Sequence, residues 1–188
     1  MNVDLWLFKI INQSLTNPFF DWLFPAITDL HKNKYFAITV IIILLASLIY
    51  KFKKLAPFYF LFFILVVSFS DFSGSKVKRI FNRPRPFQNI ETAAIQRSPA
   101  TENTSFYSNH ASNNFTFATL AGFIFPQAKI TLLAVATLIS YSRVYNGVHY
   151  PSDVFTGALV GIFWGLLFHF LLNLILKKVK KAKEKVQL

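Results

Sequence analysis

Long runs of apolar residues alternate with short polar stretches along most of the chain. A helix that crosses the hydrocarbon core of a bilayer needs about 20 predominantly apolar residues. Five segments approach this length, and the second keeps a helical pattern beyond its apolar part, through Lys76. The five segments are 35–50, 56–72, 109–125, 128–145 and 153–176. The pattern therefore predicts an all-α protein, a polytopic transmembrane helical bundle with five spans.

The N-terminal part of the chain follows a different pattern. Residues 3–14 place apolar and polar side chains at helical spacing, and residues 17–30 are interrupted by Asp21, Pro25 and Asp29. Neither piece offers a continuous apolar run that is long enough to span a bilayer. Both are therefore predicted to be interfacial helices that lie along the membrane surface. A six-span fold is the alternative, and it would require 17–30 to cross the bilayer.

Two further segments differ from simple spans and connectors. The segment 109–125 is rich in Ser, Asn and Thr, which predicts a helix that faces protein or a polar pocket and not lipid on all sides. The loop 77–107 is too long for a simple connection, so we expect it to be functional. The chain divides accordingly into interfacial helices in 1–31, a transmembrane core in 32–176 and a basic tail in 177–188.

Composition favours a membrane protein and narrows its chemistry. Of the 188 residues, 54% are hydrophobic and 18% aromatic, yet the formal net charge is +12. This combination is typical of a membrane protein with basic ends and loops, so we expect the bilayer as the partner, with no nucleic acid and no protein partner. The chain has no cysteine, which excludes disulfides, zinc–thiolate sites and thiol catalysis.

The basic residues fall on two sides of the predicted bundle. One side holds lysines in two short turns and in the tail: Lys51, Lys53, Lys54, Lys129, Lys177, Lys178, Lys180, Lys181, Lys183 and Lys185. By the positive-inside trend this side is predicted to be cytoplasmic. All five arginines fall on the opposite side: Arg79, Arg83, Arg85, Arg97 and Arg143. Because the planar guanidinium fork matches phosphate oxygens, these arginines are interpreted as anion ligands. Simple contact with lipid headgroups is the alternative.

Three clusters of polar residues occur at the ends of spans on the arginine side. They comprise Lys76, Arg83 and Pro84; Tyr107, Ser108, Asn109 and His110; and Ser142, Arg143, His149 and Asp153. A phosphoryl group in transfer spreads negative charge over three oxygens, so its catalysis depends mainly on positioning and positive charge. Lys76, Arg83 and Arg143 can supply that charge. The set therefore predicts phosphoryl transfer.

The remaining residues of the clusters are assigned by their chemistry. Ser108 is predicted to cap the next helix, whose N-terminus binds anions, so that Ser108 and Asn109 donate to the phosphate. Asp153 lies four residues after His149 and can fix its tautomer, which leaves the other ring nitrogen free as a nucleophile. His110 then protonates the leaving oxygen and later activates water. No acidic cluster could hold Mg²⁺ or Zn²⁺, so we expect no metal and no cofactor.

With these residues the chain resembles the type-2 phosphatidic acid phosphatases, also called lipid phosphate phosphatases. The motifs of that family read Lys-x6-Arg-Pro, Pro-Ser-Gly-His and Ser-Arg-x5-His-x3-Asp. Lys76, Arg83 and Pro84 match the first motif, and the third is matched in full. The second is matched at Ser108 and His110. The resemblance implies a helical bundle with the site at the outer membrane face, and the same ligands, nucleophile and acid as above.

Two residues depart from the second motif, Tyr107 in place of Pro and Asn109 in place of Gly. Glycine lets a backbone amide approach phosphate closely. Asparagine tolerates unusual backbone angles and can itself donate a hydrogen bond, so we expect activity to survive. Tyr107 is predicted to line the mouth of the pocket, against a sugar.

The lipid substrate is predicted from the arginines in excess of the motifs. Arg79, Arg85 and Arg97 could hold a second phosphate or a sugar of a large anionic headgroup. The best match within the resembled family is then its lipid A 1-phosphatase branch, with the site facing the periplasm from the bacterial inner membrane. Undecaprenyl diphosphate and phosphatidylglycerophosphate are alternative substrates. A lipid phosphotransferase and a non-catalytic protein that binds anionic lipid are the alternative functions.

Overall fold

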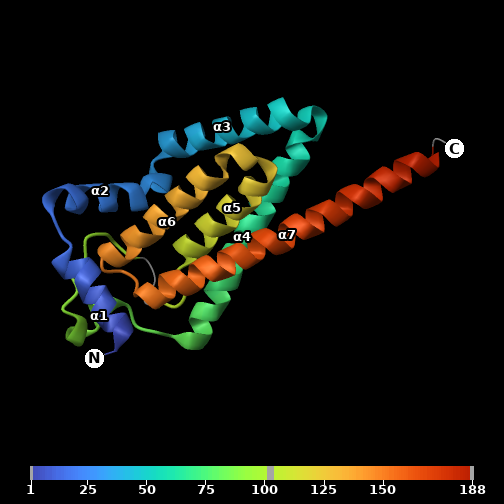
Figure 1. Cartoon of the computed structure of the whole chain (residues 1–188). Coiled ribbons are helices and arrows are strands. Elements are labelled where there is room, and N and C mark those ends of the chain that lie inside the picture. Colours follow the sequence, from blue (N-terminus) through green and yellow to red (C-terminus); the bar gives the residue numbers. More distant parts are fainter. Residues whose placement is uncertain (1, 101–103, 187–188) are drawn as a thin grey trace.

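The computed structural model describes residues 2–100 and 104–186, and this part of the chain is helical apart from its loops and an isolated bridge between Pro84 and Thr104 (Figure 1). The α-helices are α1 (Val3–Lys9), α2 (Pro18–Thr28), α3 (Lys34–Phe52), α4 (Ala56–Phe81), α5 (Asn109–Ile124), α6 (Lys129–Tyr145) and α7 (Pro151–Val186). A π-helical turn, Ile10–Ser14, follows α1. The all-α prediction is confirmed, and the five predicted spans coincide with α3 to α7. How many of them cross a membrane stays a prediction.

Helix α5 lies inside the bundle and packs against α4, α6 and α7. Its contact with α7 is close because Gly157, Gly161 and Gly165 of α7 face it at four-residue intervals. A Cβ added at Gly161 would lie 2.4 Å from the carbonyl oxygen of Ser112. Small residues at this spacing let two helix backbones approach each other, and any larger residue would force them apart.

The polar residues of α5 face protein, as predicted. The Ser112 hydroxyl lies 2.8 Å from that of Ser70 in α4, and Thr116 Oγ1 donates to Ser70 Oγ at 3.2 Å. All three side chains are buried, and buried hydroxyls need such partners. Further along the same helices an apolar core begins, to which Leu120 of α5 and Leu172 of α7 belong.

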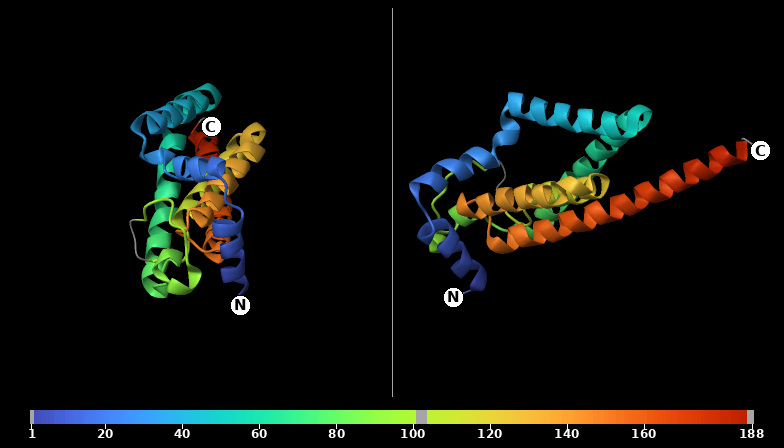
Figure 2. Two further views of the ribbon diagram at one scale, coloured as in Figure 1. Left: turned by 90° about the vertical axis from the view of Figure 1, so that its left-hand side faces the viewer. Right: turned by 45° about the horizontal axis from the view of Figure 1, so that its top comes forward.

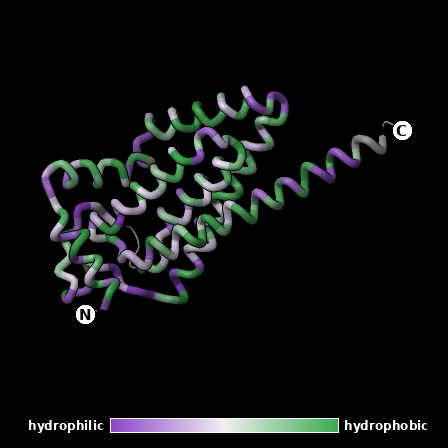
Figure 3. Tube along the Cα trace, viewed as in Figure 1, coloured by the Kyte–Doolittle hydropathy of each residue, from purple (hydrophilic) through white to green (hydrophobic). Residues whose placement is uncertain are grey.

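Helix α3 lies at the side of the bundle and packs mainly on α4 (Figure 2). It exposes consecutive apolar side chains, Ile41, Ile42 and Ile43, in a stretch that is largely hydrophobic along its length (Figure 3). The stretches Lys34–Phe81 and Pro151–Ala182 are long and apolar enough to cross a membrane by length and composition. Exposed apolar surface of this extent suits contact with lipid and not with water.

The N-terminal helices lie against the end of the bundle where the loops gather (Figure 1). Helix α1 contacts α7, and α2 contacts α6. The buried Asn12 anchors the π-helical turn, because its Nδ2 donates to the carbonyl oxygens of Tyr145 at 2.8 Å and Ile95 at 2.9 Å. Arg97 Nε donates to Asp21 Oδ1 at 2.7 Å. The two helices form as predicted, and their place at a membrane surface stays a prediction.

The bundle has two chemically different ends. The segments 82–100 and 104–108 and the turn 146–150 meet at one end, which we call the arginine end (Figure 1). The turns that contain Lys53 and Lys129 lie at the other, the lysine end, as the charge pattern predicted. Helix α7 continues without a break past the lysine end into the predicted tail (Figure 2).

Candidate active site

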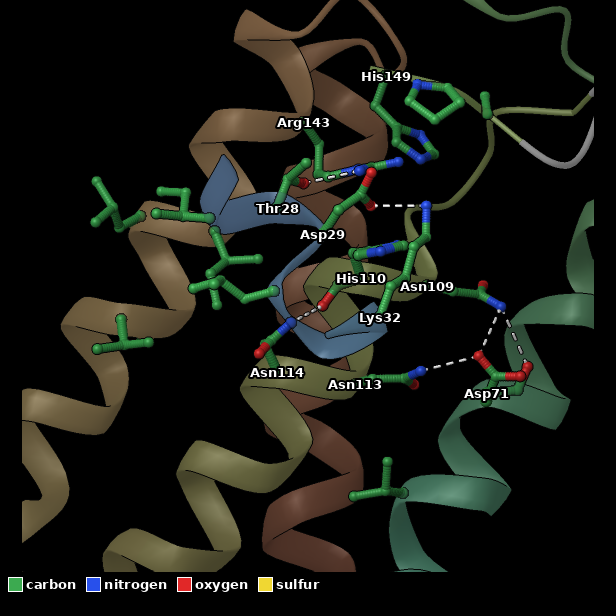
Figure 4. A pocket seen from close by; sticks show the side chains of 18 of the residues that line it. Thr28, Asp29, Lys32, Asp71, Asn109, His110, Asn113, Asn114, Arg143 and His149 are labelled. Atoms are coloured by element: carbon green, nitrogen blue, oxygen red, sulfur yellow. Dashed lines mark hydrogen bonds and ion pairs between the residues drawn. The ribbon is translucent and has the colours of Figure 1, made fainter. Parts of the chain in front are cut away.

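A cavity of about 800 Å³ lies at the arginine end, among α2, α3, α4, α5, α6 and the turn before α7 (Figure 4). Its charged and histidine residues include Lys78, Arg85, His110, Arg143 and His149. Apolar residues from deeper in the bundle also line it: Phe36, Val67, Val135, Leu138 and Ile139. A cavity with a basic part and an apolar part suits an amphiphile with an anionic head.

His149 lies in the turn between α6 and α7 and is 1% exposed. Its Nε2 is 3.2 Å from Arg85 Nη1. A guanidinium has donors only, so Nε2 must carry the lone pair, and the proton of the neutral ring lies on Nδ1. Nδ1 is 3.6 Å from Asp153 Oδ2, which is too long for a hydrogen bond but close enough for electrostatic support. The arrangement leaves Nε2 as the ring nitrogen that can attack.

The environment of His149 keeps its ring uncharged. Burial is the largest cause and the positive charges of Arg85, Arg143 and Lys78 add to it, and together they hold the pKa of His149 well below its usual 6.5. A neutral imidazole is the nucleophilic form. The same three cations line the cavity together with His149.

Asp153 lies in the first turn of α7 and is fully buried. Its Oδ2 accepts the backbone N–H of Tyr150 at 2.9 Å, the reach of a third-position side chain back to the helix cap that stabilises helix N-termini. Its Oδ1 accepts from Arg83 Nη1 at 2.7 Å. A buried carboxylate needs such compensation, and both contacts fix it beside His149.

The lysine–arginine motif occurs twice in the chain, because Lys78 and Arg85 repeat the spacing of Lys76 and Arg83 two residues further on, each arginine followed by proline. The structure brings the second copy to the cavity, where Lys78 and Arg85 are buried in its wall. Arg85 Nη1 also donates to the carbonyl oxygen of Val148 at 2.8 Å. The sequence pattern was interpreted with Lys76 and Arg83 as phosphate ligands and Arg85 as a headgroup ligand, and Lys78 was not named, although the repeat of the motif is visible in the sequence.

The first copy points elsewhere. Lys76 Nζ lies 5.1 Å from the ring centroid of Phe72, outside the cavity lining. Arg83 forms ion pairs with Asp4 and Asp153, each at 2.7 Å. Lys76 and Lys78 are two residues apart on α4, so their side chains point about 200° apart around the helix axis and cannot share a face.

The packing of α4 selects the second copy. Ser70, Gly74 and Lys78 are buried on α4 at intervals of four residues, so they share one face of the helix. That face is turned toward α5, where Ser70 meets Ser112. Lys78 therefore follows the buried face to the cavity, and Lys76 does not.

Of the other predicted residues, Arg143 and His110 line the cavity and Ser108 does not. Arg143 Nη1 donates to Thr28 Oγ1 at 2.7 Å, and within the described residues its Nε has no hydrogen-bond partner. His110, in the first turn of α5, lines the same cavity (Figure 4). Ser108 caps α5 as predicted and accepts the N–H of Ala111 at 3.4 Å. It is fully buried and the structure does not bring it to the cavity lining.

The two departures from the second motif are accommodated inside the bundle. Asn109 lines the cavity, but its Nδ2 donates to Asp71 Oδ1 of α4 at 3.2 Å. Gly74 leaves room for it, since a Cβ there would lie 2.1 Å from Asn109 Oδ1. Tyr107 is buried, with its hydroxyl 3.1 Å from Ser73 Oγ. In contrast to our expectation, Tyr107 is therefore not at the mouth of the cavity.

Of the three arginines expected to hold a headgroup, Arg85 lines the cavity. Arg97 is instead paired with Asp21 at 2.7 Å and lies 4.7 Å from the ring centroid of Tyr145. Arg79 is exposed and outside the cavity lining. Arg97 thus ties α2 to the bundle, and the excess of arginines in the sequence does not translate into an excess at the cavity.

No group of three or more His, Cys, Asp or Glu side chains that could hold a metal ion occurs within residues 2–100 and 104–186. The groups that line the cavity near His149 are nitrogen donors, which suit an oxyanion and not a cation. Metal independence stays a prediction.

Comparisons with known proteins identify the family of the chain. A family model described as PAP2 superfamily matches residues 56–175. The lipid A 4'-phosphatase of Bacteroides thetaiotaomicron is 29% identical over 178 residues, which are 90% of this chain and 77% of that protein. The crystal structure of Aquifex aeolicus LpxE is 31% identical with a TM-score of 0.72, over 89% of this chain and 95% of that one.

A second solved structure supports the fold alone. It is the first transmembrane PAP2-type phosphatidylglycerolphosphate phosphatase from Bacillus subtilis, which is 22% identical with a TM-score of 0.72, over 92% of this chain and 85% of that one.

Fold and relatives together define a membrane lipid phosphatase, a hydrolase of phosphoric monoesters. The chain belongs to the PAP2 superfamily. The family predicted from the three motifs is thereby confirmed.

Proposed function

We propose that the protein hydrolyses the 1-phosphate of lipid A through a phosphohistidine on His149. The cavity carries this proposal, because its basic part can hold an anionic headgroup while acyl chains extend past the apolar residues of α4 and α6. The relative named lipid A 4'-phosphatase, which matches 90% of this chain, supports lipid A as the substrate class.

The first chemical step transfers the phosphoryl group to the enzyme. Three cations offset its charge: Lys78, Arg85 and Arg143. His149 Nε2 attacks the phosphorus, the bond to the lipid oxygen breaks, and His110 gives that oxygen its proton. The Nδ1–H of the ring stays beside Asp153, which stabilises the positive charge that the ring acquires. In the structure Arg85 Nη1 lies 3.2 Å from Nε2, and a bound phosphate would take over this donor and free the lone pair.

The second step releases phosphate. His110, now without its proton, takes one from a water molecule as the water oxygen attacks the phosphorus. The bond between phosphorus and His149 Nε2 breaks, the lone pair returns to the ring, and inorganic phosphate leaves. His110 is again protonated and His149 neutral, so the cycle is closed.

Carboxylates in the cavity wall suit a sugar headgroup. Asp71 and Asp29 both line the cavity. Asp71 Oδ1 accepts from Asn113 Nδ2 at 2.8 Å, and Asp29 pairs with Lys32 at 2.9 Å. A carboxylate has lone pairs for several donors, which the hydroxyls of a sugar can supply. A polyprenyl diphosphate offers no such hydroxyls, so these residues favour lipid A over undecaprenyl diphosphate.

The site is proposed to face the periplasm from the bacterial inner membrane. The lysine end would then lie in the cytoplasm, where short basic loops accumulate, and the tail would rest on anionic lipid. The arginine end and the cavity would meet lipids whose headgroups are exposed outside.

The test is phosphate release by the purified protein in detergent with EDTA. The substrates are lipid A with both phosphates, undecaprenyl diphosphate, phosphatidylglycerophosphate and phosphatidic acid, with His149→Ala as the control. We expect lipid A to be hydrolysed fastest, no activity in the variant, and a product whose mass and fragmentation show loss of the 1-phosphate.

The other outcomes identify the alternatives. Loss of the 4'-phosphate would move the proposal to the other end of the same lipid. A higher rate with undecaprenyl diphosphate or phosphatidylglycerophosphate would replace the substrate. A phosphorylated acceptor with little free phosphate would indicate a phosphotransferase. Binding of anionic lipid without any hydrolysis would indicate a non-catalytic protein.

A further inference from the structure

A second ionic network lies on the far side of Asp153 from His149. Arg83 is shared between two carboxylates, with Nη1 donating to Asp153 Oδ1 and Nη2 to Asp4 Oδ2, both at 2.7 Å. Its guanidinium also lies 4.0 Å from the ring centroid of Tyr150. The side chain is 30% exposed, against 15% for Asp4 and 0% for Asp153, so the network runs from the surface to the buried carboxylate.

Asp4 connects this network to the start of α7. Its Oδ1 accepts the backbone N–H of Ser152 at 2.8 Å, and its Oδ2 accepts the Ser152 hydroxyl at 2.6 Å. Ser152 Oγ in turn accepts from Arg83 Nη1 at 2.8 Å. A carboxylate at a helix N-terminus is stabilising, and here it comes from α1, some 148 residues earlier in the chain.

The charges explain why two carboxylates share one arginine. Buried Asp153 needs a cation, yet an arginine with no other partner would add a full positive charge behind His149. Asp4 takes up part of that charge. Asp153 is then held in place by Arg83 while it keeps its capacity to support the ring of His149.

We propose that Asp4 and Arg83 are positioning residues, which orient Asp153 and through it His149, and that helix α1 is part of the catalytic apparatus. The inference rests on the proposed role of His149 as nucleophile. Neither residue lines the cavity, so each acts through Asp153 and not on the substrate.

A purely structural role predicts a different result. If the network only fastens α1 to α7, its loss lowers stability and activity together and leaves the pH dependence unchanged. If it acts on His149, the two charges shift the acid limb of kcat/KM in opposite directions. The other charged groups around His149 are Arg85, Arg143, Lys78 and Asp153, and they are the same in all variants.

The experiment compares Arg83→Gln and Asp4→Asn with the full chain in detergent, on the substrate that the wild type hydrolyses. Arg83→Gln removes a positive charge, so we expect the acid limb to move to higher pH. Asp4→Asn removes a negative charge, so it should move to lower pH. Both should lower kcat by about ten- to a hundredfold with little change in KM. The ionisation of the substrate is common to all samples and cancels in the comparison.

Two further variants complete the test. Asp21→Asn breaks the ion pair between α2 and Arg97, a matched loss of an N-terminal carboxylate, and should leave the acid limb in place. Arg83→Lys keeps the charge without the two-pronged geometry, so it should lower kcat with an unmoved limb, and it remains informative if Arg83→Gln does not fold.

The outcomes separate this inference from the proposed function. If the acid limb of kcat/KM moves in opposite directions in Arg83→Gln and Asp4→Asn, and stays in place in Asp21→Asn, Asp4 and Arg83 are established as positioning residues. Reduced thermal stability with an unshifted limb in both Asp4→Asn and Arg83→Gln, or shifts in the same direction, would overturn it. Activity that persists in His149→Ala would instead overturn the proposed nucleophile, whatever the Asp4 and Arg83 variants do.

Discussion

The two faces of the His149–Asp153 pair are both rich in arginine, yet they differ in what the arginines contact. On the cavity face, Arg85 lies against His149 Nε2 and Arg143 against a hydroxyl. On the opposite face, Arg83 is held between two carboxylates. A guanidinium that is neutralised by acids cannot bind a second anion well, whereas one beside a histidine lone pair can. Overlapping copies of one motif therefore lie in different surroundings, one at the cavity and one behind Asp153.

The residue between the faces should be the most sensitive. Asp153→Asn keeps the shape but offers an amide to His149 Nδ1, which favours the wrong tautomer. We expect kcat to fall on the order of 10³- to 10⁴-fold, with lipid binding retained. The measurement is phosphate release together with binding of the lipid by the inactive variant. Activity within tenfold of the wild type would show that Asp153 does not support the nucleophile.

The cavity face is tested at Arg85. Arg85→Gln removes a donor and a charge from the place where the phosphoryl group would lie, so kcat/KM should fall on the order of 10²- to 10³-fold. Arg79→Gln is the matched control, because Arg79 is exposed and outside the cavity. Equal losses of kcat/KM in the two variants would contradict a specific role for Arg85 at the cavity.

The pH dependence follows from His149. Burial and the neighbouring cations hold its pKa well below 6.5, so the neutral, active ring is present above that lowered pKa and is lost as pH falls through it. We expect kcat/KM to lose about tenfold per pH unit below the folded pKa. In Arg85→Gln, which removes a positive neighbour, the limb should begin at higher pH. The ratio of variant to wild type across pH gives this shift directly, and a constant ratio would contradict it.

The smallest effect is expected at Lys76. Its ammonium lies over Phe72 on the other side of α4, so Lys76→Ala should change kcat/KM within about twofold, as for other exposed charges. Lys78→Ala in the same assay serves as the positive comparison. A severe loss at Lys76 with a mild one at Lys78 would restore the first copy of the motif as the phosphate ligand.

Much of the architecture could be read from local pattern. The apolar runs predicted the positions of α3 to α7, because the length of each run indicates one helix in an apolar environment, independently of the rest of the chain. The polar residues of 109–125 predicted a helix facing protein, and Ser70 meets Ser112 there. The four-residue spacing of Gly157, Gly161 and Gly165 was also visible and would have predicted the contact of α7 with α5.

Other features depend on contacts between distant parts of the chain. Tyr107 was expected at the mouth of the cavity, but its hydroxyl forms a hydrogen bond with Ser73 of α4 inside the bundle. The side chain of Asn109 turns to Asp71 because Gly74 leaves space. Asp4 gave no signal at all, since an acidic residue in the first turn of a helix is ordinary and its partners lie far along the sequence.

The sequence by itself determined the family and the helices, and it predicted His149 and Asp153 as a pair, because these follow from apolar length and from spacing within single segments. The tertiary structure decided which copy of the lysine–arginine motif faces the cavity. That choice depends on the rotation of α4 about its axis, which the packing of Ser70 and Gly74 against α5 fixes. Both copies have the same spacing, which is a local property of the sequence. The direction in which the side chains of α4 point is set only when the helices pack.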